Sequence, residues 1–169
     1  MLGVVATASV AIAFGQEKIA QFIPFTQTNR LSSDCLAQFY RDEPPVLAKE
    51  SLKKNSYPLC FNGFNVMYSG VSKTPLWTAE HLSPQRLSQK IKREDNFHEE
   101  ERLSSAHRAL LSDYRGSGYD RGHMSPNGDM SDKTSQFDSF SLANIVPQAP
   151  KNNQQVWREL EEADRKSVV

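Results

Sequence analysis

The segment from Asp113 to Met124 constrains the fold of this chain more than any other part of the sequence. It reads Asp-Tyr-Arg-Gly-Ser-Gly-Tyr-Asp-Arg-Gly-His-Met, with glycine at positions 116, 118 and 122. Glycine adopts backbone conformations that other residues avoid, and it lets a backbone pass close to another group. We therefore expect the backbone to turn here, or to approach something closely, while carrying several charged side chains.

Side chains of this segment suit chemistry on a phosphate group. His123 has an imidazole whose pKa lies close to neutral pH, so it can take a proton from water. Asp120 can orient that imidazole or pair with an arginine. Arg121 can hold phosphate oxygens in a forked geometry, and Arg115 suits either this role or a place on the solvated surface. A histidine alone is more often structural, so the neighbouring acid and arginine are what favour a catalytic role.

A second group of candidate residues follows about thirty positions later. Asn153 lies in the first turn of the clearest helix of the sequence, expected over residues 152–166. Its carboxamide oxygen is a hard ligand that suits Mg²⁺, an ion that keeps several waters, and the alternative is a helix cap. Glu161 follows at i+8 on roughly the same face, where it can hold metal-bound waters or be one of several exposed glutamates.

The rest of the sequence predicts a mixture of short strands and helices. Tyr57 to Tyr68 is typical of strand, turn and strand, with Asn62-Gly63 as the turn. Further strands are expected over residues 76–80 and 140–146. Helical segments are expected after Asp34, near residues 106–111, and over residues 152–166, where Val156, Leu160 and Ala163 share one face. Residues 81–92 are expected to form a helix or an ordered loop, with Ser83-Pro84 as its start signal. This mixture indicates a single α+β domain.

Composition limits the classes of function. The 20 basic and 20 acidic residues give a formal net charge of zero, which counts mildly against a nucleic-acid partner. A local groove of arginines can nevertheless attract phosphates on a neutral protein. The sequence has no Gly-x-x-x-x-Gly-Lys loop, no Gly-x-Ser-x-Gly elbow and no His-Glu-x-x-His motif. It therefore lacks the usual motifs of P-loop enzymes, serine hydrolases and zinc proteases.

The N-terminus suggests export. Residues 1–15 are uncharged and end in small residues, like the end of a secretory signal without its basic start; the alternative is an apolar strand or helix. We expect a signal-like segment over 1–15, one domain over 16–169, a periplasmic or secreted location, and no membrane partner once the signal is removed. In an exported protein Cys35 and Cys60 would form a disulfide; in a cytosolic protein they would be two free thiols.

The combined motifs closely resemble the DNA/RNA non-specific endonuclease family, the ββα-metal group. The segments that carry the resemblance are Asp120-Arg-Gly-His123, Asn144-Ile-Val-Pro-Gln148, and Asn153-Gln-Gln-Val-Trp157 with Glu161. Tyr114-Arg-Gly-Ser-Gly-Tyr-Asp120 is similar to the endonuclease G branch. The resemblance implies a His-Me finger fold with a central, mostly antiparallel sheet, in which a strand pair and a helix hold one Mg²⁺, or Mn²⁺ in its place.

The resemblance also implies a role for each candidate residue. His123 would be the general base, Asn153 the direct metal ligand, and Glu161 would act on the water shell of the ion. Arg121 would serve the active site, and Asn144 would support its geometry. A further family arginine lies upstream of an aromatic residue, and its match in this sequence is Arg93, ahead of Phe97.

The implied substrates are DNA and RNA, bound through the phosphate backbone with little sequence preference. Members of the family often form homodimers, but the sequence identifies no contact surface for one. The family usually continues with further strands beyond this helix, whereas this chain stops at Val169, so we expect a fold truncated at its C-terminus. The alternative function is an inactive or truncated homologue that acts as a nucleic-acid-binding or interaction module.

Overall fold

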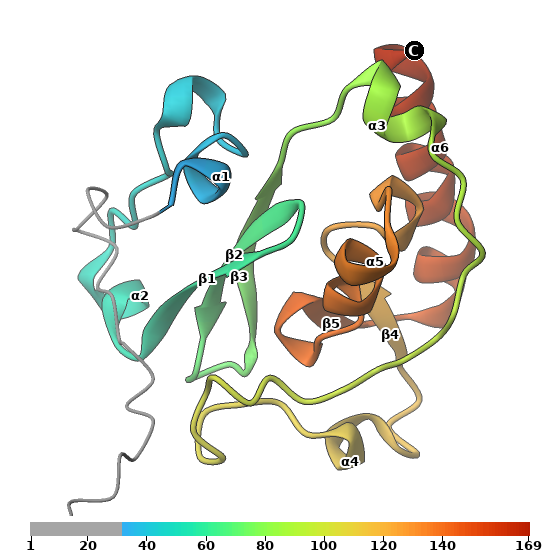
Figure 1. Ribbon diagram of the computed structural model, residues 1–169. Helices are drawn as coiled ribbons and strands as arrows, with labels where there is room; N and C mark the ends of the chain where they lie inside the picture. Colours follow the sequence, from blue (N-terminus) through green and yellow to red (C-terminus); the bar gives the residue numbers. More distant parts are fainter. Residues whose placement is uncertain (1–31) are drawn as a thin grey trace, which may run out of the picture.

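The computed structural model describes residues 32–169, so the expected signal-like segment over residues 1–15 lies outside the described residues. The described chain forms an antiparallel sheet in the order β1-β2-β3 and a separate antiparallel ribbon of β4 and β5. Short helices surround both (Figure 1). The expected α+β architecture with antiparallel strands is confirmed. Every helix within residues 32–169 is too short or too polar to cross a membrane.

The sheet begins with the hairpin that the sequence predicts. Its strands β1 (Ser56–Phe61) and β2 (Phe64–Ser69) are joined by Asn62 and Gly63. Gly63 has a φ of +93°, in the left-handed region that favours glycine. The third strand, β3 (Thr74–Glu80), pairs with β2 and includes the strand expected over residues 76–80.

The main core is built on the central strand. Every residue of β2 is buried, and Phe64, Val66 and Tyr68 have no exposed surface. Burial of such side chains stabilises the fold by about 2 kcal/mol each. The same cluster includes residues from later segments of the chain, namely Leu103, Met130 and Ala143. The core therefore ties the sheet to the chain on both sides of β4.

Five short helices lie around the sheet and ribbon: α1 (Ser33–Leu36), α2 (Glu50–Lys53), α3 (Pro84–Ser88), α4 (Leu111–Tyr114) and α5 (Lys133–Ser139). Within the helix or ordered loop expected over residues 81–92, Pro84–Ser88 are helical, and the Ser83 hydroxyl accepts a 3.2 Å hydrogen bond from the Arg86 N–H. The helix expected after Asp34 starts slightly earlier, because Ser32 is its N-cap.

Two of the sequence expectations about helices are wrong. The helix expected near residues 106–111 is instead α4, because the Asp113 carboxylate accepts a 2.9 Å hydrogen bond from the Leu110 N–H and fixes the helix start there. Helix α5 was not expected at all. Its start is set by Asp132, whose carboxylate accepts hydrogen bonds from the N–H groups of residues 134 and 135.

The strand expected over residues 140–146 is also misplaced. Phe140 caps α5, and Leu142–Asn144 form a 3-10 turn whose start is capped by the Ser141 hydroxyl. The strand β5 runs from Ile145 to Gln148 and contains Pro147, beyond the expected strand end at residue 146. Proline is tolerated at the edge of a sheet, and a two-stranded ribbon offers such an edge.

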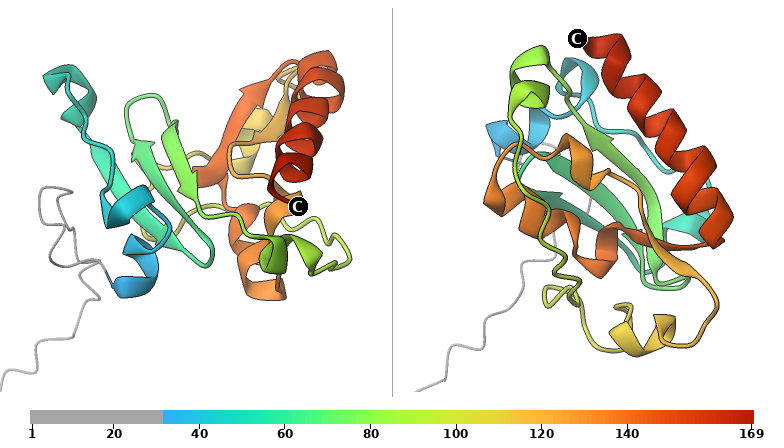
Figure 2. Two further views of the ribbon diagram at one scale, coloured as in Figure 1. Left: turned by 90° about the horizontal axis from the view of Figure 1, so that it is seen from above. Right: turned by 90° about the vertical axis from the view of Figure 1, so that its right-hand side faces the viewer.

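The ribbon leads into a long helix and completes a ββα unit. Strand β4 (Asp120–His123) pairs with β5, after which a π-helical turn (Asn152–Trp157) leads into α6 (Arg158–Val168). The helix expected over residues 152–166 is therefore confirmed. This unit and the N-terminal helix α1 lie on opposite sides of the three-stranded sheet (Figures 1 and 2).

The long helix does not bury its apolar face. Val156 and Leu160 are 51% and 56% exposed. The half-buried residues instead recur every fourth position, which places them on one face: Asn153, Trp157, Glu161 and Arg165. The expected shared face of Asn153 and Glu161 is confirmed, and it is this mostly polar face that turns toward the protein.

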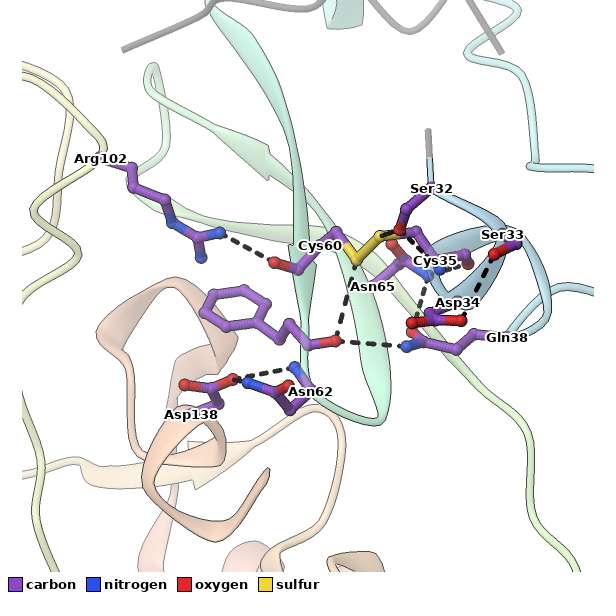
Figure 3. Close-up of a disulfide and its surroundings, with 11 residues drawn as sticks. Ser32, Ser33, Asp34, Cys35, Gln38, Cys60, Asn62, Asn65, Arg102 and Asp138 are labelled. Carbon is purple, nitrogen blue, oxygen red and sulfur yellow. Dashed lines mark hydrogen bonds between the residues drawn. A yellow bond between two sulfur atoms is a disulfide. The ribbon is translucent and has the colours of Figure 1, made fainter. Parts of the chain in front are cut away.

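A disulfide joins Cys35 of α1 to Cys60 of β1, with the two Cα atoms 5.9 Å apart (Figure 3). Beside it, the Asn65 amide donates hydrogen bonds to the Cys35 carbonyl at 2.8 Å and to the Gln38 side chain at 2.7 Å. The two cysteines therefore form the disulfide that the sequence analysis expected for an exported protein. This bond fixes α1 against the hairpin.

Candidate active site

The strand pair β4–β5 brings the Asp-Arg-Gly-His motif into register with the segment that begins at Ile145. His123 lies opposite Ile145, and Asp120 lies opposite Gln148. Successive side chains of a strand point to opposite faces, so Arg121 and His123 share one face of β4. The motif is thus a strand rather than the turn that its glycine content suggested; the turn precedes it, where Gly116 and Gly118 have positive φ.

His123 is buried against aromatic rings. It is 9% exposed, with ring centroids 5.6 Å from Phe97 and 5.1 Å from Phe140, and its Nε2 atom has no hydrogen-bond partner among the described residues. Burial, together with the nearby Arg93 charge, lowers the pKa of His123 from 6.5 to about 4. The imidazole is therefore neutral near pH 7 and has a nitrogen available to accept a proton.

Asn144 holds the backbone that directly follows His123. It is fully buried, and its amide donates to the carbonyls of Ser125 and Ser139 at 2.9 and 3.0 Å. Its side-chain oxygen accepts from the Ser125 N–H at 2.9 Å, and its carbonyl accepts from the Met124 N–H at 2.9 Å. Asn144 therefore fixes the backbone that follows His123 and does not itself line a cavity.

Asp120 and Asn153 form the contact between the ribbon and the π-helical turn. The Asn153 Nδ2 donates a 3.0 Å hydrogen bond to the Asp120 Oδ2, which also accepts from Gln154 at 2.8 Å. These two hydrogen bonds lower the pKa of the Asp120 carboxyl. Because a carboxylate only accepts, it selects the nitrogen of the Asn153 amide and leaves the Oδ1 atom without a partner among the described residues.

Arg93 and Glu161 extend the site toward α6. Arg93 lies over the ring of Phe140 at 5.2 Å, and its Nε donates to Asp95 at 2.6 Å. Loss of hydration raises the pKa of the half-buried Glu161 carboxyl, while Arg165 and Arg93 oppose that rise. The charge of Arg93 thus acts on both His123 and Glu161, so its guanidinium lies near both side chains.

An open cavity of about 480 Å³ adjoins these residues. Its lining residues come from the segment before β4, from β4 itself and from the π-helical turn: Phe97, Leu111, Tyr114, Arg115, Tyr119, Asp120, Arg121 and Asn153. The Arg121 guanidinium lies 4.1 Å from the centre of the Phe97 ring, which also packs against His123. Two arginines, a carboxylate and a carboxamide side chain therefore line one space, and Phe97 connects its wall to His123.

Sequence reasoning missed an ion pair that holds this arrangement together. Arg165 of α6 donates to the Asp129 carboxylate at 2.9 Å, and the two side chains are only 20% and 4% exposed. Arg165 is also the charged group that most strongly lowers the pKa of Glu161. Its position is four residues beyond Glu161, so extending the i, i+4 series from Asn153 identifies it in the sequence. The helical spacing does not identify its partner Asp129, which lies outside the helix.

The donor set around Asn153 fits a hydrated hard cation. The atoms present are a free carboxamide oxygen and the adjoining Asp120 carboxylate, and the Glu161 carboxylate lies eight residues further along the same helix face. Oxygen atoms of these kinds are the ligands that Mg²⁺ or Mn²⁺ prefers. Residues 32–169 contain no group of three or more histidine, cysteine, aspartate or glutamate side chains arranged to hold a metal. A zinc-type cage is thus absent from this part of the chain.

Comparison with known proteins decides the family. The sequence profile of the DNA/RNA non-specific endonucleases matches residues 43–169, which is most of the chain. The chain belongs to this family. Human mitochondrial endonuclease G is 39% identical over 115 residues, covering 66% of this chain and 36% of the human protein. A nuclease of Nostoc sp. is 31% identical over 170 residues, covering 99% of this chain and 60% of that protein.

The fold agrees with this assignment. A crystal structure of EndoG in complex with EndoGI superposes with a TM-score of 0.62 at 28% identity, covering 64% of this chain and 46% of that chain. The expected His-Me finger class, with a strand pair followed by a helix, is confirmed. The chain spans between about a third and three fifths of the length of these relatives.

Proposed function

We propose that this chain hydrolyses phosphodiester bonds of DNA and RNA as a metal-dependent endonuclease without sugar specificity. The observation that carries the proposal is a neutral, buried His123 with an unpaired nitrogen, next to a cavity lined by Arg115, Arg121 and Asn153. Membership of the endonuclease family supports the same activity.

The proposed roles follow from these positions. His123 accepts a proton from the attacking water, and a phosphate anion held beside the ring raises its pKa toward the working pH. Arg121 and Arg115 bind phosphate oxygens through charge-assisted hydrogen bonds. Asp120 holds the Asn153 amide so that its oxygen faces outward. Asn153 would hold a Mg²⁺ ion and Glu161 its water molecules, and the ion would supply charge neutralisation on the phosphate and the leaving oxygen.

The test is plasmid nicking in the presence of Mg²⁺. We expect His123→Ala to abolish nicking while thermal unfolding remains cooperative, because the base is lost and the core cluster is untouched. His81→Ala, at an exposed histidine, serves as the matched control and should nick normally. Undiminished nicking by His123→Ala would end the proposed mechanism. A wild-type protein that unfolds cooperatively but never nicks would instead favour the binding-module alternative.

The metal assignment has its own test. We expect Asn153→Ala to lower the nicking rate steeply and to shift the Mg²⁺ titration to higher concentration, because the direct ligand is lost. Gln155→Ala, an exposed amide two positions away on the same turn, is the control. An unchanged titration for Asn153→Ala would remove this residue from the ligand role.

We also propose that the protein is periplasmic or secreted. The support is the Cys35–Cys60 disulfide, since such bonds persist in oxidising compartments. The test is fractionation of the producing cells followed by thiol labelling without a reductant. A protein that stays in the cytoplasm with both thiols labelled would contradict this location.

A further inference from the structure

Tyr119 is an exposed aromatic side chain at the cavity beside the candidate active site. It is 55% exposed, and its ring has no aromatic or cation contact among residues 32–169. It follows Gly118, whose φ is +79°, and directly precedes Asp120 at the start of β4. A single exposed tyrosine is ordinary. Tyr119 lines the same cavity as Asn153, so its ring is placed to contact a molecule bound there.

The other aromatic rings of this cavity are already engaged. The Arg121 guanidinium lies 4.1 Å over the centre of the Phe97 ring, so this face of the ring is covered. Tyr114 is half-buried, and its hydroxyl donates to the Ile145 carbonyl at 3.3 Å. Tyr119 therefore offers the accessible ring face to a molecule in the cavity.

The chemistry of the walls matches a nucleotide. Arg115 and Arg121 supply positive charge for phosphate, and Tyr119 supplies a flat apolar surface for a base. The cavity volume of about 480 Å³ falls within the usual range for sites that hold a small organic ligand. Arginines that contact phosphate beside an aromatic ring that stacks on a base are the usual means of binding a single strand.

We propose that this cavity is a nucleotide subsite next to the scissile phosphate, in which Tyr119 stacks on one unpaired base and Arg115 contacts the adjoining phosphate. The proposal rests on the proposed function and adds a preference for single-stranded or locally unpaired nucleic acid. Bases in a duplex are stacked on both faces, so they reach Tyr119 only after the strand is distorted.

The test measures binding without cleavage. The full chain is titrated in EDTA into a short fluorescein-labelled oligo(dA) strand, and anisotropy gives the dissociation constant. The same titration uses an abasic strand of equal length, which keeps every phosphate but lacks the bases. Tyr119→Ala is compared with Tyr119→Phe, which keeps the ring, and with Tyr40→Ala, an 81% exposed tyrosine in the N-terminal part of the described chain.

We expect Tyr119→Ala to weaken binding of oligo(dA) about tenfold and to leave binding of the abasic strand unchanged. Tyr119→Phe and Tyr40→Ala should bind like the wild type. Equal weakening on both strands would assign Tyr119 to the fold or to phosphate contact, and would overturn the subsite. No weakening on either strand, or no binding of oligo(dA) by the wild type, would also overturn it.

These outcomes are independent of the nicking assay. A wild type that nicks plasmid but shows no dependence on Tyr119 removes the subsite and leaves the nuclease proposal. A wild type that never nicks, but loses oligo(dA) affinity with Tyr119→Ala, removes the nuclease proposal and leaves a single-strand-binding site.

Discussion

His123 owes its protonation state to two phenylalanine rings. Phe97 and Phe140 remove most of the water that would hydrate an imidazolium ion, and Arg93 disfavours a second positive charge nearby. The folded state therefore keeps the ring neutral down to a pH of about 4, whereas an unfolded chain takes up a proton near the ordinary pKa of 6.5. Burial therefore keeps His123 neutral, as a general base must be, and it also makes the fold less stable at acidic pH.

Acid sensitivity gives a prediction at the scale of this residue. Above the unfolded pKa of 6.5 both states are neutral, so His123 has no effect on pH dependence. As the pH falls toward 4, only the unfolded state gains the proton, and we expect the free energy of unfolding to drop by about 3 kcal/mol. Urea unfolding at neutral pH and near the lower pKa measures this difference.

The variant His123→Gln should remove most of that pH-dependent difference, whatever its own stability at neutral pH. His81→Gln should keep it, because His81 is exposed. A wild type and a His123→Gln variant with the same change in unfolding free energy would show that other groups control the acid sensitivity.

The sequence identifies candidate residues of the site better than it identifies the contacts around them. His123, Asp120 and Asn153 are found because their chemistry stands out within short motifs. The Asn153–Asp120 hydrogen bond spans 33 positions, and the Arg165–Asp129 ion pair spans 36. Such pairings depend on how the elements fold back on each other, which no local pattern encodes. The phenylalanine rings around His123 were missed for the same reason.

Elements with a strong local signal are also the ones predicted correctly. The β1–β2 hairpin has an Asn-Gly turn between two apolar runs, and the long helix has an uninterrupted helical sequence. Strand β4 has only four residues, and their glycine and charges give no alternation. Along the long helix the apolar residues share one face as expected, but Val156 and Leu160 on that face are exposed, and a mostly polar face turns toward the protein.

The C-terminal contact of α6 gives a prediction at the scale of an element. Arg165→Met leaves the Asp129 carboxylate buried without its cation, so we expect the free energy of unfolding to fall by about 3 kcal/mol. Amide hydrogen exchange should become faster throughout α6. Arg158→Met is the matched control, because its 3.9 Å pair with Glu162 is exposed and contributes less than about 1 kcal/mol. Equal effects of the two variants would contradict an anchoring role for Arg165.

The disulfide gives a second prediction about elements. It closes a loop of 25 residues and ties α1 to β1, so the double variant Cys35→Ala/Cys60→Ala should lose about 3 kcal/mol. For a chain of this size the melting temperature should fall by about 10 °C. Nicking should persist below that temperature, because the ββα unit lies on the other side of the sheet from α1 (Figure 1). A reductant should lower the melting temperature of the wild type and leave that of the double variant unchanged.

At the scale of the whole molecule, the charge is balanced. The 20 basic and 20 acidic residues give no net attraction for a polyanion at a distance. Attraction must then come from local groups, and the cavity beside β4 supplies two arginines, Arg115 and Arg121. A neutral protein with a local basic site should bind nucleic acid with a shallow dependence on salt, unlike a protein that is basic throughout.

The salt dependence of oligonucleotide binding tests this view of the molecule. Two phosphate contacts on a single strand predict a slope of about −1.4 for the logarithm of the binding constant against that of the salt concentration. Arg115→Gln and Arg121→Gln should each reduce the magnitude of that slope by about 0.7. Lys53→Gln, on α2 and far from the ribbon, should leave it unchanged (Figure 1). An equal loss of slope with Lys53→Gln would mean that binding depends on charge spread over the surface rather than on this cavity.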